Sequence, residues 1–261
     1  GECAQPCRRL YTLRDADGAA LAENKHLLSL KDLNLSRRLS HLAAAGITSF
    51  KIEGRLKDRD YVRNVVSHYR RELDKVMAKR GCSRPSLGKS FAAFEPNTAK
   101  TFNRGFTEYF IDGNPADIAS PDTPKFVGET LGPATDVKAG SFRLHCADRL
   151  HPGDGISYFD RKGVLAGSLV NGVGEGRVRA DNLRGLENGT LVYRNLDREF
   201  IRSVERGAQR RLALKLVLSD VEGGFSLKAS DERGAAAEAR WRGVKSAAQK
   251  PEAALDTMRK Q

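Results

Sequence analysis

The alternation of apolar and polar positions in the first third of the chain predicts strands and helices in turn. Residues 27–33 form a short apolar run that leads into a helix, which Gly46 ends. Residues 47–52 alternate and are rich in β-branched side chains, which is typical of a strand. Apolar side chains then recur at helical spacing over 61–79. This order predicts an α/β layer or barrel.

The pattern changes near residue 81. Residues 81–96 are rich in Ser, Gly and Pro and indicate a linker, whereas 125–180 contain short alternating segments between turn signals. Residues 156–159 can pair with 163–169 across a tight turn. We therefore expect a small antiparallel β-barrel here.

A third segment begins near residue 181. Four leucines at alternate positions, 212 to 218, predict one face of a strand, and Glu222-Gly223-Gly224 predicts a turn into a second strand. Residues 251–261 begin a helix. We expect an incomplete α+β domain, and both ends of the sequence resemble internal positions of a longer chain.

Charge and cysteine content narrow the class of protein. Residues 1–90 hold 19 Lys and Arg against 10 Asp and Glu, a surplus of nine within the total of +12. An anionic partner is therefore most plausible at the first third, and a well-solvated basic surface is the alternative. No apolar run has the roughly 18 residues of a membrane span. Four cysteines in 261 residues favour reduced thiols and a cytoplasmic location over a disulfide framework.

Three motifs stand in order along the first 107 residues. The first is Gly-Glu-Cys-Ala-Gln-Pro-Cys-Arg at 1–8, and the second comprises 27–33 and Gly-Ile-Thr-Ser-Phe-Lys-Ile-Glu-Gly-Arg-Leu-Lys at 46–57. The third is Phe-Asn-Arg-Gly-Phe-Thr at 102–107. Together they resemble the collagenase-like peptidase U32 family. Residues 181–261 are more loosely similar to the domain appended in the long branch of that family.

The resemblance implies a domain order and an activity. It implies the C-terminal part of a TIM-barrel-like catalytic domain at 1–95, a β-barrel domain at 96–180 and an incomplete appended α+β domain at 181–261. Members of the family install hydroxyl groups on tRNA uridine, rRNA cytidine or ubiquinone precursors without molecular oxygen. The long branch implies formation of 5-hydroxycytidine in 23S ribosomal RNA, with tRNA as the alternative substrate. We expect the fragment alone to be inactive.

The resemblance also implies cofactors. It implies that Cys3 and Cys7 are two ligands of a [4Fe–4S] cluster, whose other ligands would lie upstream. It also implies that prephenate is the hydroxyl donor. From spacing alone, two cysteines make half a metal site or two inert thiols, although sulfur ligands do select iron–sulfur clusters or zinc. Arg8 and Arg9 would offset the charge of a cluster. Iron–sulfur assembly proteins are possible partners.

The second motif supplies the candidate catalytic residues. Glu53 and Arg55 directly follow a predicted barrel strand, where catalytic groups of such barrels lie. Arg55 offers a planar fork for a dicarboxylate or a phosphate, and Lys51 shares a strand face with Glu53. The alternative is a structural Glu–Arg ion pair. Asp32 is a weaker candidate, equally suited to capping a helix.

The remaining residues give weaker signals. Asn103-Arg104-Gly105 predicts a turn with Gly105 at positive φ, and substrate contact is the alternative. The five histidines have no metal-ligand spacing, and no Ser-His-Asp or H-E-x-x-H pattern occurs. A collagenase-like peptidase therefore stays the second hypothesis for function, and a non-catalytic RNA-binding accessory the third. Tyr158, Phe159 and Tyr193 could stack on bases or belong to a core.

Overall fold

A computed structural model describes residues 3–54, 56–82, 84, 86–115, 117–244 and 249–260. It is a mixed α/β structure that divides into two units, Gly1–Ser83 with Ala92–Ala208 and Arg84–Phe91 with Gln209–Gln261. The mixed α/β class confirms the sequence-based prediction. The predicted domain boundaries at 95/96 and 180/181 stay predictions.

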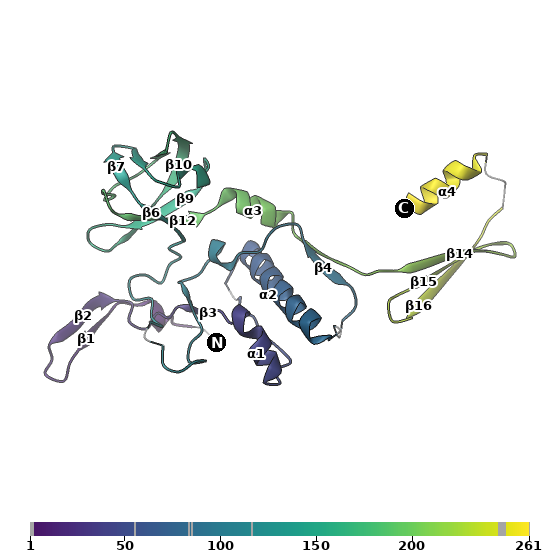
Figure 1. Cartoon of the computed structure of the whole chain (residues 1–261), viewed down its shortest axis with the longest axis horizontal. Helices are drawn as coiled ribbons and strands as arrows, with labels where there is room; N and C mark the ends of the chain where they lie inside the picture. Colours follow the sequence, from purple (N-terminus) through teal and green to yellow (C-terminus); the bar gives the residue numbers. More distant parts are fainter. Residues whose placement is uncertain are drawn as a thin grey trace. The chain divides into compact units, whose positions relative to one another are not determined.

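The first unit begins with an α/β region (Figure 1). Strands β1 and β2 form an antiparallel hairpin, and β3 and β5 form a parallel pair. The elements of this region are η1 (Pro6–Arg8), β1 (Tyr11–Arg14), β2 (Ala20–Lys25), β3 (Asp32–Leu33), η2 (Ser36–Arg38), α1 (Leu39–Ala44), α2 (Arg59–Arg80), η3 (Thr98–Lys100) and β5 (Phe106–Thr107).

Helix α2 confirms the periodicity predicted for 61–79. The Asp58 carboxylate caps its first turn by accepting a hydrogen bond of 2.7 Å from the Tyr61 backbone N–H. Gly81 ends it in the left-handed conformation (φ 63°), which a residue without Cβ adopts at no steric cost. On the buried face, the Asn64 amide donates to the Asn97 carbonyl at 2.7 Å. This bond ties the helix to the segment that leads into η3.

The predicted strand at 47–52 was wrong. Residues 47–54 have no regular secondary structure, and Ile47 and Ile52 are 43% and 39% exposed. A strand needs a neighbour that accepts and donates its backbone hydrogen bonds. Among the described residues, β3 pairs with β5 and no strand pairs with 47–52.

A seven-stranded antiparallel sheet follows in the same unit, in the order β6-β12-β9-β10-β11-β8-β7. Its elements are β6 (Glu129–Pro133), β7 (Thr135–Lys138), β8 (Ser141–Arg143), η4 (Ala147–Arg149), β9 (Gly155–Phe159), β10 (Leu165–Gly174), β11 (Arg177–Ala180) and β12 (Leu191–Leu196). Leu165 pairs with Phe159 across the β9–β10 turn, which confirms the predicted hairpin.

This sheet is curled but is not the closed barrel that the sequence suggested. The edge strands β6 and β7 are separated only by Ala134, so the sheet bends round a single core. Within the described part of the chain, no ladder joins β6 to β7. Ala134 instead donates to the Thr190 carbonyl and accepts from Gly189, both at 2.8 Å. The loop before β12 therefore forms hydrogen bonds with both backbone polar groups of Ala134 at the bend.

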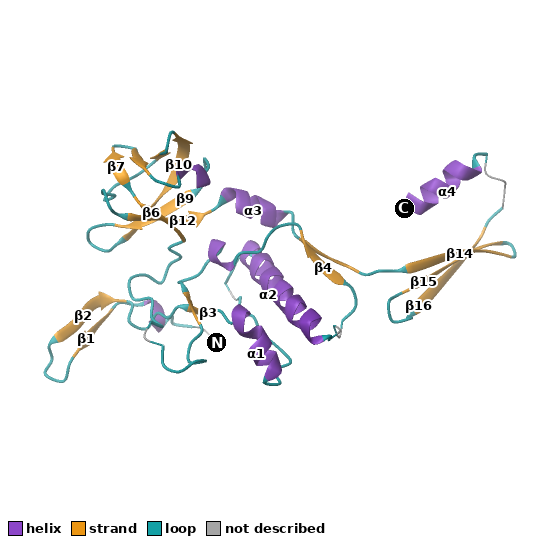
Figure 2. Ribbon diagram, in the orientation of Figure 1, coloured by secondary structure: helices purple, strands orange, loops and turns teal. Residues whose placement is uncertain are grey.

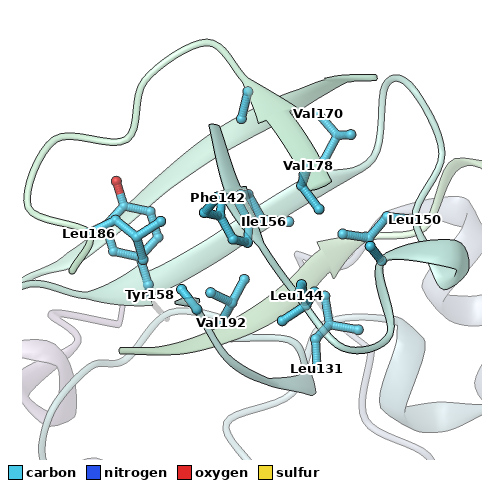
Figure 3. Packing of buried hydrophobic residues seen from close by; sticks show 13 residues of the cluster. Leu131, Phe142, Leu144, Leu150, Ile156, Tyr158, Val170, Val178, Leu186 and Val192 are labelled. Carbon is cyan, nitrogen blue, oxygen red and sulfur yellow. The ribbon is translucent and has the colours of Figure 1, made fainter. Parts of the chain in front are cut away.

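Strand alternation builds the core of this sheet (Figure 3). Phe142, Ile156, Tyr158, Val178 and Val192 are each at most 1% exposed. The Tyr158 hydroxyl donates to the Arg184 carbonyl at 3.0 Å, so its polar end is not left unpaired. Burying each such side chain contributes about 1.5–3 kcal/mol.

Helix α3 (Arg198–Glu205) continues from β12. The Asp197 side chain caps it by accepting from the Phe200 backbone N–H at 2.9 Å. Phe200 and Val204 pack with Phe94 in a second, smaller core, where the two phenyl rings meet edge to face at 6.3 Å.

The second unit is dominated by a meander of three strands in the order β14-β15-β16 (Figure 2). Its turn at Glu222-Gly223 confirms the predicted hairpin. The elements here are β14 (Lys215–Val221), β15 (Gly224–Ser230), β16 (Ala236–Arg242) and α4 (Pro251–Lys260), together with the paired strands β4 (Lys89–Ala92) and β13 (Ala208–Arg211) at the unit boundary. None of the helices in the described ranges is both long and apolar enough to span a membrane.

Candidate functional site

Asp32 joins the second and third sequence motifs. Its carboxylate accepts hydrogen bonds of 2.8 Å from both the Arg104 guanidinium and the Arg104 backbone N–H. Its backbone N–H donates to the Gly105 carbonyl at 2.9 Å. Gly105 has φ +82°, and its N–H donates to the Asn103 side-chain oxygen at 3.1 Å, so the predicted turn is confirmed. Asp32 bonds Arg104 and does not cap a helix.

Lys57, at the end of the second motif, lies near Asp32 and Arg104. Its ammonium lies 3.0 Å from the centroid of the Phe102 ring and 5.5 Å from that of Tyr61, an arrangement that favours a cation. Burial lowers the pKa of Lys57, and the nearby charges of Arg104 and Arg8 lower it further, against the opposite effect of Asp32. Lys57 therefore lies among the charged groups of all three motifs.

Cys7 completes the group from the first motif. Helix η1 carries it, and the preceding Gln5 is in the left-handed region (φ 51°). The hydrogen bond that Arg104 donates to Asp32 raises the pKa of Arg104, and Cys7 lies close enough to contribute to the same rise. Cys7 is half-buried and Cys3 exposed. We call Cys7, Asp32, Lys57, Phe102 and Arg104 the motif cluster.

The donor set fits half of an iron–sulfur site. Thiolates are the ligands that iron–sulfur clusters require, and the cations around Cys7 would offset the negative charge of a thiolate-bound cluster. Within the described residues, no group of three or more His, Cys, Asp or Glu side chains could hold a metal ion. The ligand roles of Cys3 and Cys7 stay predictions.

Two of the predicted catalytic residues, Lys51 and Glu53, lie on the irregular segment 47–54. The Lys51 ammonium and the Glu53 carboxylate are 3.1 Å apart, with side chains 85% and 63% exposed. The strand face predicted for them does not form, because residues 47–54 have no regular secondary structure. Arg55 lies outside the described residues. The catalytic roles of Lys51, Glu53 and Arg55 stay predictions.

Sequence reasoning missed Lys57 and Phe102 as site residues and treated Arg104 as part of a turn. All three fall inside the motifs that carried the resemblance. The sequence did show a lysine in one motif and a phenylalanine in another. It could not show that Lys57 contacts Phe102, because the two residues are 45 positions apart.

An open groove of about 600 Å³ begins at Arg104. Lys31 and Arg104 line it from the α/β region, and Phe159 and Tyr193 line it from β9 and β12. The rings of Phe159 and Tyr193 meet edge to face at 6.5 Å and 87°. Motif residues and aromatic side chains of the seven-stranded sheet thus share one groove.

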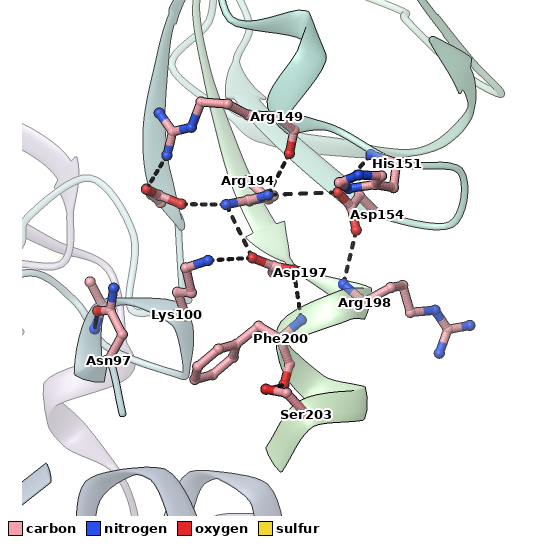
Figure 4. Close-up of polar contacts among 12 residues, drawn as sticks. Asn97, Lys100, Arg149, His151, Asp154, Arg194, Asp197, Arg198, Phe200 and Ser203 are labelled. Carbon is pink, nitrogen blue, oxygen red and sulfur yellow. Dashed lines mark hydrogen bonds and ion pairs between the residues drawn. The ribbon is translucent and has the colours of Figure 1, made fainter. Parts of the chain in front are cut away.

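A second charged group centres on Arg194, whose side chain is 6% exposed (Figure 4). Its guanidinium lies 2.8 Å from a Glu129 oxygen and 3.1 Å from an Asp197 oxygen, and it donates to the Arg149 carbonyl at 2.7 Å. Asp197 also pairs with Lys100 at 2.6 Å. Burial alone would raise the pKa of Glu129, but Arg194 and Arg149 hold it below its usual value. This Arg194 network connects η3, β6, β12 and α3.

Comparison with known proteins defines the class. Residues 1–120 match the model of peptidase family U32. Residues 1–120, which contain the whole motif cluster, are therefore similar to a peptidase family U32 domain.

Individual relatives divide into RNA-modifying proteins and collagenases. The chain is 34% identical over 244 residues to the 23S rRNA 5-hydroxycytidine C2501 synthase of Escherichia coli, covering 90% of this chain and 37% of that protein. It is 30% identical to a collagenase of Porphyromonas gingivalis, over 66% of this chain and 41% of the relative. It is 31% identical to tRNA hydroxylation protein P1 of Bacillus subtilis, over 61% and 39% respectively.

The chain thus spans about two fifths of the length of these relatives. No solved structure matches it significantly.

Proposed function

We propose that the chain is part of an oxygen-independent RNA hydroxylase that forms 5-hydroxycytidine in 23S ribosomal RNA. The observation that carries this proposal is the 34% identity to the E. coli synthase over 90% of the chain. That match extends far beyond the 120 residues of the family model. The collagenase and the tRNA hydroxylation protein match 66% and 61% of the chain.

The arrangement of the motif cluster supports an anionic reactant. Cys7 lies near Arg104, Lys57 lies near Arg104 and Arg8, and Asp32 is the carboxylate that fixes Arg104. Electrostatic attraction to such a group favours a negatively charged co-substrate. We propose prephenate for this role, with Arg55 as the predicted fork for its carboxylates.

We propose Cys3 and Cys7 as two ligands of a [4Fe–4S] cluster. Such a cluster supplies one-electron transfer when bound. Within this chain, Asp32 would orient Arg104, and Arg104 and Lys57 would stabilise negative charge beside Cys7. Glu53 and Lys51 are proposed to move a proton or to orient the substrate.

The wider setting follows from the same proposal. The α/β region with β3, β5 and α2 would be the C-terminal part of a TIM-barrel-like domain. The protein would work in the cytoplasm, with ribosomal RNA as its substrate and iron–sulfur assembly proteins as further partners.

Complementation tests the proposal. The full-length gene is expressed in an E. coli strain that lacks its 23S rRNA 5-hydroxycytidine synthase, and rRNA nucleosides are measured by mass spectrometry. We expect the wild type and the Cys82→Ser control to restore 5-hydroxycytidine, since Cys82 is exposed and lies outside the motifs. We expect Cys7→Ser to abolish it.

Three results would contradict the proposal. Unmodified rRNA with the wild type would reject it, and new 5-hydroxyuridine in tRNA instead would favour the tRNA alternative. Cleavage of gelatin by the purified full-length protein, without RNA modification, would favour the peptidase.

A further inference from the structure

The outer face of β9 and β12 carries two aromatic side chains that the core does not use. Tyr158 and Val192, opposite each other in the ladder, are 1% and 0% exposed and belong to the core. Side chains alternate along a strand, so Phe159 and Tyr193 lie on the other face, where both are half-buried. Their edge-to-face pair forms one wall of the groove at Arg104.

The charges in this groove are balanced. Lys31 forms an ion pair with Asp117, and Arg104 is held by Asp32. A second carboxylate, Asp122, pairs with Lys25 at 2.6 Å. An isolated phosphate would meet carboxylates as well as cations here. A neutral, flat and polar group fits this environment better.

The exposed carboxylates add a preference for hydrogen-bond donors. The Asp117 side chain is 78% exposed and the Asp122 side chain 58%, so both keep oxygen lone pairs accessible beside their lysines. Cytosine presents an exocyclic amino group that pairs with carboxylates, and its flat face stacks on aromatic rings. A volume of about 600 Å³ is in the range of small-ligand sites.

We propose that this groove binds an unpaired nucleobase of the RNA, stacked against Tyr193 and Phe159, with cytosine as the preferred base. This inference rests on the proposed function. It adds the seven-stranded sheet to the substrate-binding surface and assigns Tyr193 as a residue that positions the RNA.

The test measures binding of the full-length protein to an rRNA fragment that contains the substrate cytidine, by fluorescence anisotropy. Removing one stacking partner weakens such binding roughly five- to a hundredfold, so we expect a loss in this range for Tyr193→Ala. Tyr193→Phe keeps the ring and should bind within about twofold of the wild type. Phe110→Ala is the matched control, because Phe110 is 64% exposed and does not line the groove; it should bind like the wild type.

A second measurement does not depend on how the variants fold. RNA with 5-iodocytidine at the substrate position is irradiated in complex with the wild-type protein, and cross-linked peptides are identified by mass spectrometry. We expect cross-links to Tyr193 or Phe159. Cross-links confined to other residues, or a folded Tyr193→Ala variant that binds like the wild type, would overturn the inference while leaving RNA hydroxylation intact. A wild-type protein that neither binds nor hydroxylates the RNA would reject both proposals.

Discussion

The Arg194 network and the motif cluster use the same pairing of arginine with aspartate, yet their surroundings differ. The Arg194 side chain is 6% exposed and meets three carboxylates, of Glu129, Asp154 and Asp197, within 3.8 Å. In the motif cluster, the Arg104 side chain is 20% exposed and Asp32 33% exposed. There Lys57 and Arg8 add positive charge near Arg104, and the Cys7 thiol lies near the same arginine.

We propose that this difference separates a structural role of the Arg194 network from a functional role of the motif cluster. Buried, mutually compensated charges fix the geometry of the elements that carry them, because leaving one partner unpaired is costly. A partly exposed group with surplus positive charge and a thiol retains capacity for an anion or a metal. Both Arg104 and Arg194 pair with an aspartate, so their direct partners do not distinguish them. Their burial and the balance of charge around them do.

The largest expected effect is on stability at Arg194. Arg194→Met should destabilise the protein by about 3–5 kcal/mol, because it leaves buried carboxylates without their cation. The free energy of unfolding from urea titration measures this. Arg161→Met is the control, since Arg161 pairs with Glu187 at the surface with its side chain 82% exposed, and it should unfold like the wild type. Equal stability of the two variants would contradict the structural role of the Arg194 network.

The pH dependence of stability should have the same origin. Lys100, the Phe200 backbone N–H and Arg194 hold the pKa of Asp197 below its usual value, against the opposing effect of burial. Arg194 and Arg149 lower the pKa of Glu129 in the same way. A carboxylate with a depressed folded-state pKa stabilises the protein above its unfolded pKa and loses this contribution as pH falls through the folded value. Stability should therefore decline below about pH 4.5. The double variant Glu129→Gln/Asp197→Asn should show a shallower decline between pH 5 and 3 in thermal unfolding, and an unchanged slope would contradict the assignment.

Arg104→Ala should have a smaller effect on stability and a large one on activity. Its pair with Asp32 is partly exposed, so we expect about 1–2 kcal/mol of destabilisation. The full-length variant should lose most 5-hydroxycytidine formation while it remains folded. A matching loss with Asp32→Asn would show that Asp32 acts by orienting Arg104, whereas full activity of both variants would place the working site elsewhere.

The smallest effect on stability should occur at Lys51 and Glu53. Their ion pair is exposed, and such pairs contribute little. We expect Glu53→Gln to leave the thermal midpoint unchanged and to reduce hydroxylation, as its predicted catalytic role requires. Glu108→Gln offers a comparison, because Glu108 pairs with Arg38 outside the motif cluster. Full activity of Glu53→Gln would withdraw that role.

Local signals explain which parts of the fold were predictable. Helix α2 has a capping aspartate and a terminal glycine at its two ends, and the β9–β10 hairpin has a short turn. The strand predicted at 47–52 failed because pairing depends on a partner elsewhere in the chain. The curled sheet was taken for a closed barrel because the contacts of Ala134 with residues 189 and 190 are not local.

The site was predictable as motifs but not as an arrangement. Cys7 was singled out as a candidate by its motif, whereas the Asp32–Arg104 bond joins residues 72 positions apart. Lys57 lies over the Phe102 ring, a contact that neither residue indicates alone. Tyr193 was recognised as a candidate for stacking, but its position beside Arg104 depends on how β12 enters the sheet.

We propose that the motif cluster is the working site of an RNA hydroxylase. Its most direct test is the 5-hydroxycytidine content of 23S rRNA in the complemented strain, compared between the wild-type full-length protein and Arg104→Ala at equal protein levels. We expect 5-hydroxycytidine with the wild type and little or none with the variant. Equal amounts with both proteins, or none with the wild type, would contradict it.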